Sequence, residues 1–272
     1  GGAVNCKYLI AYKGWDDDFD TDNGYSGKVQ FGLSVRDPRL ADQSQSNGFE
    51  SDNCADGAQL TPYTTATFSN ITFVGPKAAA DFQNDKSYIT GGDYFPNNGS
   101  GLGKFQSAMQ IRRSSRLNCV NSVATDWPIG LIVDGEKGNT VEQANAGTLN
   151  IKNIYFANMD VVGTDANKCY EDKEYDFKTK SVKADSEMSF SHRFFEKQDG
   201  NKYFADKSQL MLTDGKGVGV PFMPQAGSLL FGAQNFDGLD AWFDQVTYIG
   251  AFNAGDNWLD GWTNFDPQNA NY

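Results

Sequence analysis

The sequence predicts an all-β chain built as a stack of parallel β-helix coils. A unit of two short apolar strands recurs along the chain, with apolar and acidic side chains at matching positions in successive units. A single unit cannot bury its apolar face, but units stacked ~4.8 Å apart pair their backbones and enclose one continuous core. A β-sandwich would also alternate, yet it does not predict equivalent residues in successive units.

The first strand of the unit is recognised by self-similarity. Residues 17–23 (DDFDTDN) align with residues 47–53 (NGFESDN), and residues 108–114 (AMQIRRS) and 129–135 (IGLIVDG) fit the same frame. Strict alternation then predicts one inward stack, formed by Phe19, Phe49, Met109 and Leu131. It also predicts one outward column, formed by Asp22, Asp52, Arg112 and Asp134.

A second strand follows each first strand. Its signature begins at Leu9 (LIAY), Gly32 (GLSV), Asn70 (NITF), Asn121 (NSVA), Asn153 (NIYF) and Gln245 (QVTY). Strand, bend, strand and loop therefore repeat about five times, at intervals of roughly 25–50 residues. We expect one domain in three parts: coils over residues 1–160, a charged insertion with long loops over 161–226, and a last coil with an aromatic C-terminal cap over 227–272.

Composition limits the classes of partner. The net charge of −12 and the pI near 4.5 argue against nucleic acid and against an anionic membrane surface, because binding phosphate needs clustered lysine and arginine. No run of ~18 apolar residues is present, so we expect no membrane-spanning segment. With one histidine and four widely spaced cysteines, a zinc site is not expected, and both disulfides and free thiols stay open.

Several runs resemble a widespread family of Bacteroidota surface proteins: WDDDFDTDNGYSGKVQFGLSVRDP, SNGFESDN, IRRSSRLNCVNSV, WPIGLIVDG and YIGAFNAGDNWLDGWTNFDPQNANY. The resemblance covers most of the chain and implies a right-handed parallel β-helix. It also implies an extracellular or cell-surface protein, secreted or held as an outer-membrane lipoprotein, whose signal peptide and first coils precede this chain. It names no catalytic residue. The four cysteines and residues 161–217 depart from the family pattern.

The acidic run over residues 16–22 is the most conspicuous candidate site. The spacing of Asp18, Asp20 and Asp22 resembles a calcium loop, but the glycine comes too late and no glutamate stands at the twelfth position, so it is not an EF-hand. We expect these three aspartates to point outward, with Asp20 near Glu50 and Asp22 near Asp52.

Like charges placed about 5 Å apart repel unless a cation or an arginine lies between them. Two interpretations follow. Either Ca²⁺ is bound by the five carboxylates, or the face is solvated and Arg112 or Arg113 of the next coil offsets Asp52 and Asp134. The five candidate ligands are Asp18, Asp20, Asp22, Glu50 and Asp52.

Aromatic side chains give a second candidate site. The C-terminal tail carries Trp258, Trp262, Phe265 and Tyr272 among polar residues. Exposed aromatic faces can stack on sugar rings, but a tail of this kind can equally cover the open edge of the last coil. The charged insertion, densest over residues 169–206, is either a recognition loop or a solvated excursion.

An enzyme on this scaffold would be a Ca²⁺-assisted polysaccharide lyase or a glycoside hydrolase. Such enzymes need paired carboxylates or a basic residue, for which Asp17, Asp18, Arg112 and Arg113 are available. The only histidine, His192, has no G-x-S-x-G partner, and we assign no catalytic residue.

The sequence therefore favours a non-enzymatic cell-surface binding or assembly protein, accessory to outer-membrane uptake of glycan or peptide, with the β-helix enzyme as the alternative. In the binding interpretation, Trp258, Trp262, Arg112 and Arg113 are the candidate ligand contacts.

Overall fold

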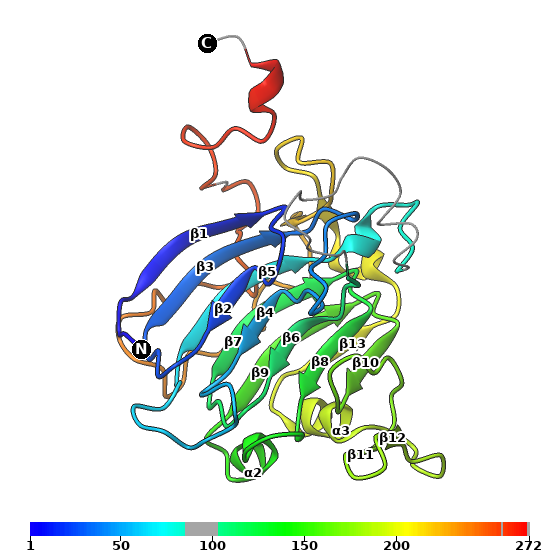
Figure 1. The fold of residues 1–272 in the computed structure, drawn as a ribbon. Coiled ribbons are helices and arrows are strands. Elements are labelled where there is room, and N and C mark those ends of the chain that lie inside the picture. Colours follow the sequence, from blue (N-terminus) through cyan, green and yellow to red (C-terminus); the bar gives the residue numbers. More distant parts are fainter. Residues whose placement is uncertain (85–102, 257, 271–272) are drawn as a thin grey trace.

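The computed structural model describes residues 1–84, 103–256 and 258–270, and two parallel sheets form its body (Figure 1). The long sheet contains β1 (Cys6–Tyr12), β3 (Lys28–Val35), β5 (Thr67–Val74), β7 (Asn118–Thr125), β9 (Asn150–Ala157) and β13 (Lys202–Phe204) in that order. The short sheet contains β2 (Phe19–Thr21), β4 (Phe49–Ser51), β6 (Ser107–Ile111), β8 (Ile129–Val133) and β10 (Val161–Thr164). From β1 to β10 the chain alternates between the sheets, so one coil contributes a strand to each.

The inward stack predicted from the sequence is confirmed by the strand register. Phe19 pairs with Phe49, Phe49 with Met109, and Met109 with Leu131. Phe49, Met109 and Leu131 are fully buried, and the ring of Phe49 lies 5.8 Å from that of Phe68 on the long sheet. Each such side chain contributes about 1.5–3 kcal/mol by leaving water, so the space between the two sheets is the core.

Each of the first five strands of the long sheet bends at one residue with a positive φ. The bend residues are Tyr8 (61°), Phe31 (61°), Asn70 (58°), Asn121 (50°) and Asn153 (52°). Their chain neighbours pair in register, so the bends form one column across the sheet. A positive φ is uncommon outside glycine and is best tolerated by asparagine, which explains the asparagine that opens three of the second-strand signatures.

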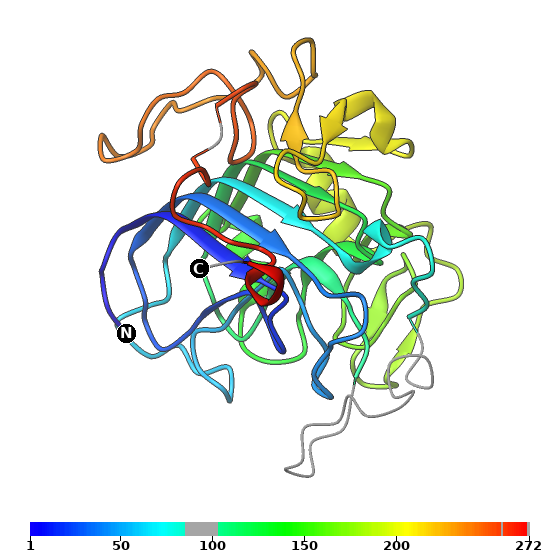
Figure 2. The same cartoon turned by 90° about the horizontal axis from the view of Figure 1, so that it is seen from above.

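The C-terminal segment covers the outside of the long sheet beyond the bends (Figure 2). Outward side chains such as Leu33 and Val74 pack against Phe222 and Phe252 from this segment, and Tyr155 packs against Leu230. The strand expected at Gln245 is therefore wrong. Residues 245–248 lie on the outer face instead, where the Asn70 side chain donates to the Tyr248 carbonyl at 2.9 Å. A segment that packs on a sheet alternates like a strand within it.

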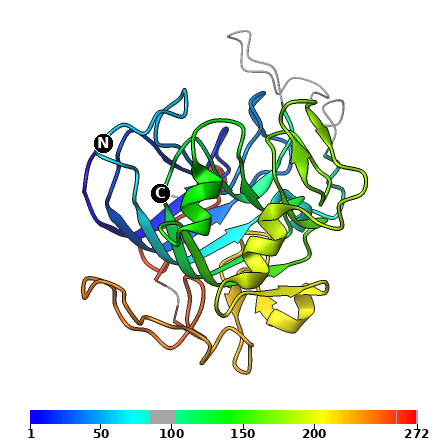
Figure 3. The same cartoon turned by 90° about the horizontal axis from the view of Figure 1, so that it is seen from below.

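The core is closed at its last coil by α3 (Phe190–Lys197), shown in yellow in Figure 3. Phe194 and Phe195 are buried, Phe195 stacks on Phe156 with a centroid distance of 4.6 Å, and the helix contacts β8 and β10. Residues 161–226 thus contribute one strand to each parallel sheet, β10 and β13, and the closing helix, in addition to short hairpins and loops.

The aromatic tail does not cover the last coil, so that expectation is wrong. Trp258 lies 5.4 Å from Tyr8, and Phe265 lies 4.9 Å from Tyr12, both measured between ring centroids. Tyr8 and Tyr12 belong to β1, at the opposite end of the stack. The tail reaches β1 because the segment that precedes it runs back along the outer face of the long sheet.

The remaining elements are short. They are α2 (Thr140–Asn145), the hairpins β11 (Tyr175–Asp176) with β12 (Ser181–Val182) and β14 (Leu212–Thr213) with β15 (Met223–Pro224), and the 3-10 turns η1 (Pro76–Ala78), η2 (Lys207–Leu210) and η3 (Pro267–Asn269). In the described part of the chain, no helix has the length and apolar character needed to cross a membrane. All four cysteines lie in this part and are free thiols; burial raises the pKa of Cys119 to about 12.

Candidate functional site

The acidic side chains of the first coils gather on the outside of the short sheet, on a surface we call the acidic face. It comprises Asp17, Asp20, Asp22, Glu50, Asp52, Gln110, Arg112, Arg113 and Asp134. Asp20 pairs in register with Glu50, and Glu50 with Gln110. One step further along, the Asp52 amide donates to the Thr21 carbonyl at 2.9 Å, which places Asp52 beside Asp22 as predicted.

Arginine from the third coil neutralises part of this face. Arg112 donates from Nη2 to Glu50 at 2.6 Å and from Nε to Asp52 at 2.8 Å. Arg113 donates from Nη1 to the other Asp52 oxygen at 2.6 Å. The Glu50 and Asp52 side chains are only 14% and 7% exposed, so these are nearly buried, charge-assisted contacts. Arg112 and Arg113 thus occupy the offsetting position that the second interpretation expects.

The acidic face carries more carboxylates than guanidinium groups. Burial raises the pKa of Glu50, and the charge of Asp17 raises it further, although Arg112 opposes both effects. Burial and the charge of Asp16 likewise raise the pKa of Asp17, although its Oδ1 accepts from the Asn47 amide at 2.6 Å. A carboxyl group kept protonated near neutral pH can act as a general acid. Asp17 and Glu50 are therefore the carboxyl groups of the acidic face whose protonated form is most favoured by burial.

Asp18 does not belong to the acidic face. Its side chain is fully buried and bound to Arg36, with 2.5 Å between Oδ1 and Nη1, and it accepts from the Ser34 hydroxyl at 2.5 Å. The expectation that Asp18 points outward with Asp20 and Asp22 is wrong, because Asp18 precedes β2 and does not follow the alternation of the strand. Among the described residues, no group of three or more His, Cys, Asp or Glu side chains is placed to hold a metal ion.

The two tryptophans expected to bind ligand have different surroundings. Trp258 stacks on Phe252 with a centroid distance of 5.2 Å and donates from Nε1 to the Ala251 carbonyl at 2.8 Å. Trp262 is 59% exposed and donates to the Trp258 carbonyl at 2.6 Å. Trp258 therefore packs between the tail and Tyr8, while Trp262 stacks on Trp258 with a centroid distance of 6.0 Å and stays largely exposed. Tyr272 lies outside the described residues.

A groove on the long sheet has no counterpart among the sites expected from the sequence. A cavity of about 480 Å³ lies over the outward side chains of β5, β7 and β9 before the bend. An adjoining cavity of about 760 Å³ shares Asn153, Asp199, Asn235 and Asp237 with it. We call the two together the amide groove. One wall is the sheet, and the other is formed by residues 233–239.

The bend column fixes the far wall of the amide groove. Asn121 donates from Nδ2 to the Asn235 carbonyl and accepts from the Asn235 amide at Oδ1, both at 2.9 Å. Gln30 makes the same pair of bonds with Asp244, at 2.8 and 2.9 Å. Each of these side chains thus bonds both the N–H and the carbonyl of one backbone residue, and we call residues 233–239, anchored in this way at Asn235, the strap.

The sequence hid this groove because Asn121 and Asn235 are 114 residues apart. A usable signal was present in the asparagines at matching positions of β7 and β9, Asn118 and Asn150.

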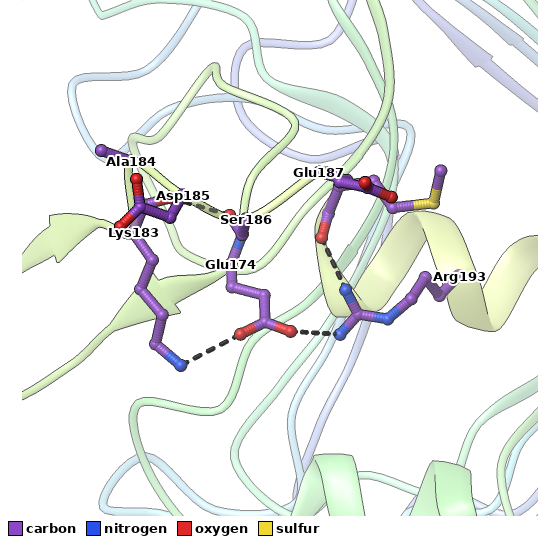
Figure 4. A pocket seen from close by; sticks show the side chains of 8 residues that line it. Glu174, Lys183, Ala184, Asp185, Ser186, Glu187 and Arg193 are labelled. Atoms are coloured by element: carbon purple, nitrogen blue, oxygen red, sulfur yellow. Dashed lines mark hydrogen bonds and ion pairs between the residues drawn. The ribbon is translucent and has the colours of Figure 1, made fainter.

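A third concavity lies on the insertion, between β12 and α3 (Figure 4). Its volume is about 660 Å³, and charged side chains that already pair with one another cross it. Glu174 accepts from Lys183 at 3.0 Å and from Arg193 at 2.7 Å. Nearby, His192 Nδ1 lies 2.6 Å from Asp172. These contacts hold the β11–β12 hairpin against the helix.

Parallel coils of two strands, an apolar core and outward polar columns define a β-helix protein. The model of the pectate-lyase-like β-helix domain family matches residues 1–193, and the chain belongs to this family. No curated protein and no solved structure matches it. The matched region contains the acidic face and most of both sheets, whereas the strap over residues 233–239 lies beyond it.

Proposed function

We propose that this protein binds a polysaccharide in the amide groove on the outside of its β-helix. The observation that carries the proposal is a preformed groove whose floor is a repeating column of polar side chains. We also propose that the protein acts at the cell surface, as a secreted or lipid-anchored partner of outer-membrane nutrient uptake. The sequence resemblance supports this location.

The floor of the groove suits sugar rings. Asn150 Nδ2 already donates to Asn118 and to the Gly147 carbonyl, so Asn150 offers its Oδ1 as an acceptor, and Asn118 offers its second N–H as a donor, to the hydroxyls of a sugar. Asn150 donates from Nδ2 to Asn118 at 2.9 Å, and Asn118 donates to the Arg116 carbonyl at 3.1 Å. Held in this way, the amides lose little conformational entropy on binding. Val120 and Leu239 add apolar contacts for the carbon faces of the rings.

Binding is tested by isothermal titration calorimetry with soluble polysaccharides, using the double variant Asn118→Ala/Asn150→Ala. Each lost hydrogen bond weakens binding by about 0.5–1.5 kcal/mol, so two lost bonds should make the double variant bind at least about fivefold more weakly. Asn269→Ala, which removes an exposed amide outside the groove, is the control and keeps full affinity. Equal affinity of the double variant and the wild type would remove the groove from the proposal.

A second candidate function is favoured by the raised pKa values of Asp17 and Glu50. Cleavage of a polysaccharide on the acidic face, by acid–base hydrolysis or by Ca²⁺-assisted elimination, would use these carboxyl groups. Since Glu50 and Asp52 are bound by arginine, Asp20 and Asp22 are the carboxylates left for Ca²⁺. Release of reducing ends, measured with and without added Ca²⁺ in wild type and Glu50→Gln, tests this function. No release from neutral or acidic polysaccharides would end it.

A further inference from the structure

We infer that the ligand of the amide groove is an uncharged polysaccharide that runs along the stacking axis of the coils, with one sugar ring over each coil. This inference rests on the proposed function and specifies the substrate class. It contrasts with a uronate chain, which carries one carboxylate on every ring.

The direction of the ligand follows from the register. Thr67 on β5 pairs with Asn118 on β7, and Asn118 pairs with Asn150 on β9. The three polar side chains therefore repeat along the stacking axis every ~4.8 Å, the spacing of neighbouring strands. This step is close to the length of one pyranose ring along an extended polysaccharide. A chain laid across the strands meets an equivalent side chain at every ring.

The apolar contacts follow the same axis. Val120 on β7 pairs in register with Lys152 on β9, one alternation step from the polar column. Val120 is 7% exposed, and Leu239 of the strap faces the same cavity. A ring over β7 can therefore place a carbon face between these two side chains while its hydroxyls reach Asn118.

Charge decides the class of polysaccharide. The groove contains Lys152, Asp199 and Asp237, so carboxylates outnumber the ammonium group. Lys152 lies 3.8 Å from Asp199, whose side chain is 89% exposed. Two other lysines on this side of the sheet are already paired with the segment that follows the strap: Lys28 with Asp240 at 3.2 Å and Lys7 with Asp244 at 2.7 Å.

A uronate chain in this groove would bring one negative charge per ring toward two aspartates, in a protein of net charge −12. Like charges at this range repel, and the remaining lysine cannot compensate a repeating anion. Neutral rings carry no such penalty and keep every hydrogen bond that the amides offer. The groove therefore selects against anionic chains.

The experiment compares a soluble neutral glucan and a neutral mannan with polygalacturonate, by calorimetry at low and at moderate salt. We expect at least one neutral polymer to bind, and polygalacturonate to bind at least tenfold more weakly at low salt. Asp199→Asn/Asp237→Asn should strengthen polygalacturonate binding several-fold relative to the binding of the neutral polymer, because it removes the two groove carboxylates. Asp185→Asn/Glu187→Gln, which removes two carboxylates from the insertion, is the matched control and should change neither.

Chain length tests the alignment. For the neutral polymer that binds, affinity should rise from its disaccharide to its trisaccharide and then level off, because three strands form the floor of the smaller cavity.

The outcomes separate the two claims. If polygalacturonate binds as tightly as the neutral polymers and Asn118→Ala/Asn150→Ala weakens this binding, the inference fails and the proposed function stands. If no polysaccharide binds, the proposed function fails as well. Neutral binding that Asn118→Ala/Asn150→Ala does not weaken, with a preference over polygalacturonate that Asp199→Asn/Asp237→Asn does not reduce, would overturn the assignment to this groove.

Discussion

The buried ion pair between Asp18 and Arg36 should make Arg36→Ala strongly destabilising. Arg36 Nη1 lies 2.5 Å from Asp18 Oδ1 and donates to the Asp16 carbonyl at 2.6 Å, and Nη2 donates to the Leu40 carbonyl at 3.3 Å. Both charged side chains are fully buried. The variant leaves the Asp18 carboxylate buried, with the Ser34 hydroxyl as its remaining donor among the contacts described above.

Breaking a buried pair by removing one partner costs about 3–5 kcal/mol, a large part of the ~5–15 kcal/mol that holds a typical domain together. The loss should depend on pH. Burial raises the pKa of Asp18 even beside Arg36, and without the guanidinium it rises further. The folded variant then favours the protonated carboxyl more than the unfolded chain does. The loss of unfolding free energy in Arg36→Ala is therefore smallest below ~3.9, the pKa of the unfolded chain, and grows until the pH passes the raised pKa of Asp18 in the folded variant.

Urea unfolding of wild type and Arg36→Ala at pH 4.5 and pH 8 measures this deficit. The double variant Asp18→Asn/Arg36→Met, which removes both charges, is the control and should be more stable than the single variant at pH 8. A deficit below about 1 kcal/mol at pH 8, or one that is equal at both pH values, would refute the reasoning.

Three further predictions concern the core, the strap and the insertion. Phe49→Ala should lower the free energy of unfolding, measured in urea, by about 3–5 kcal/mol because the ring is fully buried. Trp262→Ala, at an exposed side chain, should stay within ~0.5 kcal/mol of wild type. Similar losses in the two variants would contradict the assignment of Phe49 to the core. Asn121→Ala should speed amide hydrogen exchange over residues 233–239 by removing both bonds to the strap, and unchanged exchange there would count against the strap's anchoring. The hydrogen bond to Asp172 raises the pKa of His192, so the contribution of this pair to stability is fully present below pH ~6.5 and is lost as the pH rises through the raised pKa. Amide hydrogen exchange in α3 should therefore show this loss of protection with pH in wild type but not in His192→Gln.

The repeat was predictable because stacking imposes one physical requirement on every coil. Each coil must place an apolar side chain at the same register position to face the shared core, as it does with Phe19, Phe49, Met109 and Leu131. The alternation of a strand makes this pattern recognisable in the sequence. The inward stack and the outward column next to it were derived correctly for this reason.

The errors lie where alternation does not determine the environment. Asp18 stands one residue before its strand and turns toward Arg36. The segment at Gln245 alternates because it packs on the sheet from outside. β10 and β13 have only four and three residues, too few to show a period among charged neighbours. The amide groove depends on the strap meeting β7 across more than a hundred residues, which no local pattern records.

The C-terminal segment has a consequence for how the molecule comes apart. Coils that touch only their neighbours loosen from the ends inward, each nearly independent of the others. Here one stretch of chain is bound by Gln30 on β3, Asn70 on β5 and Asn121 on β7, and the tail beyond it reaches Tyr8 on β1. The coils that carry β1, β3, β5 and β7 therefore share one outer segment, so opening any of them disturbs contacts that the others also make. We expect this part of the stack to unfold cooperatively rather than coil by coil.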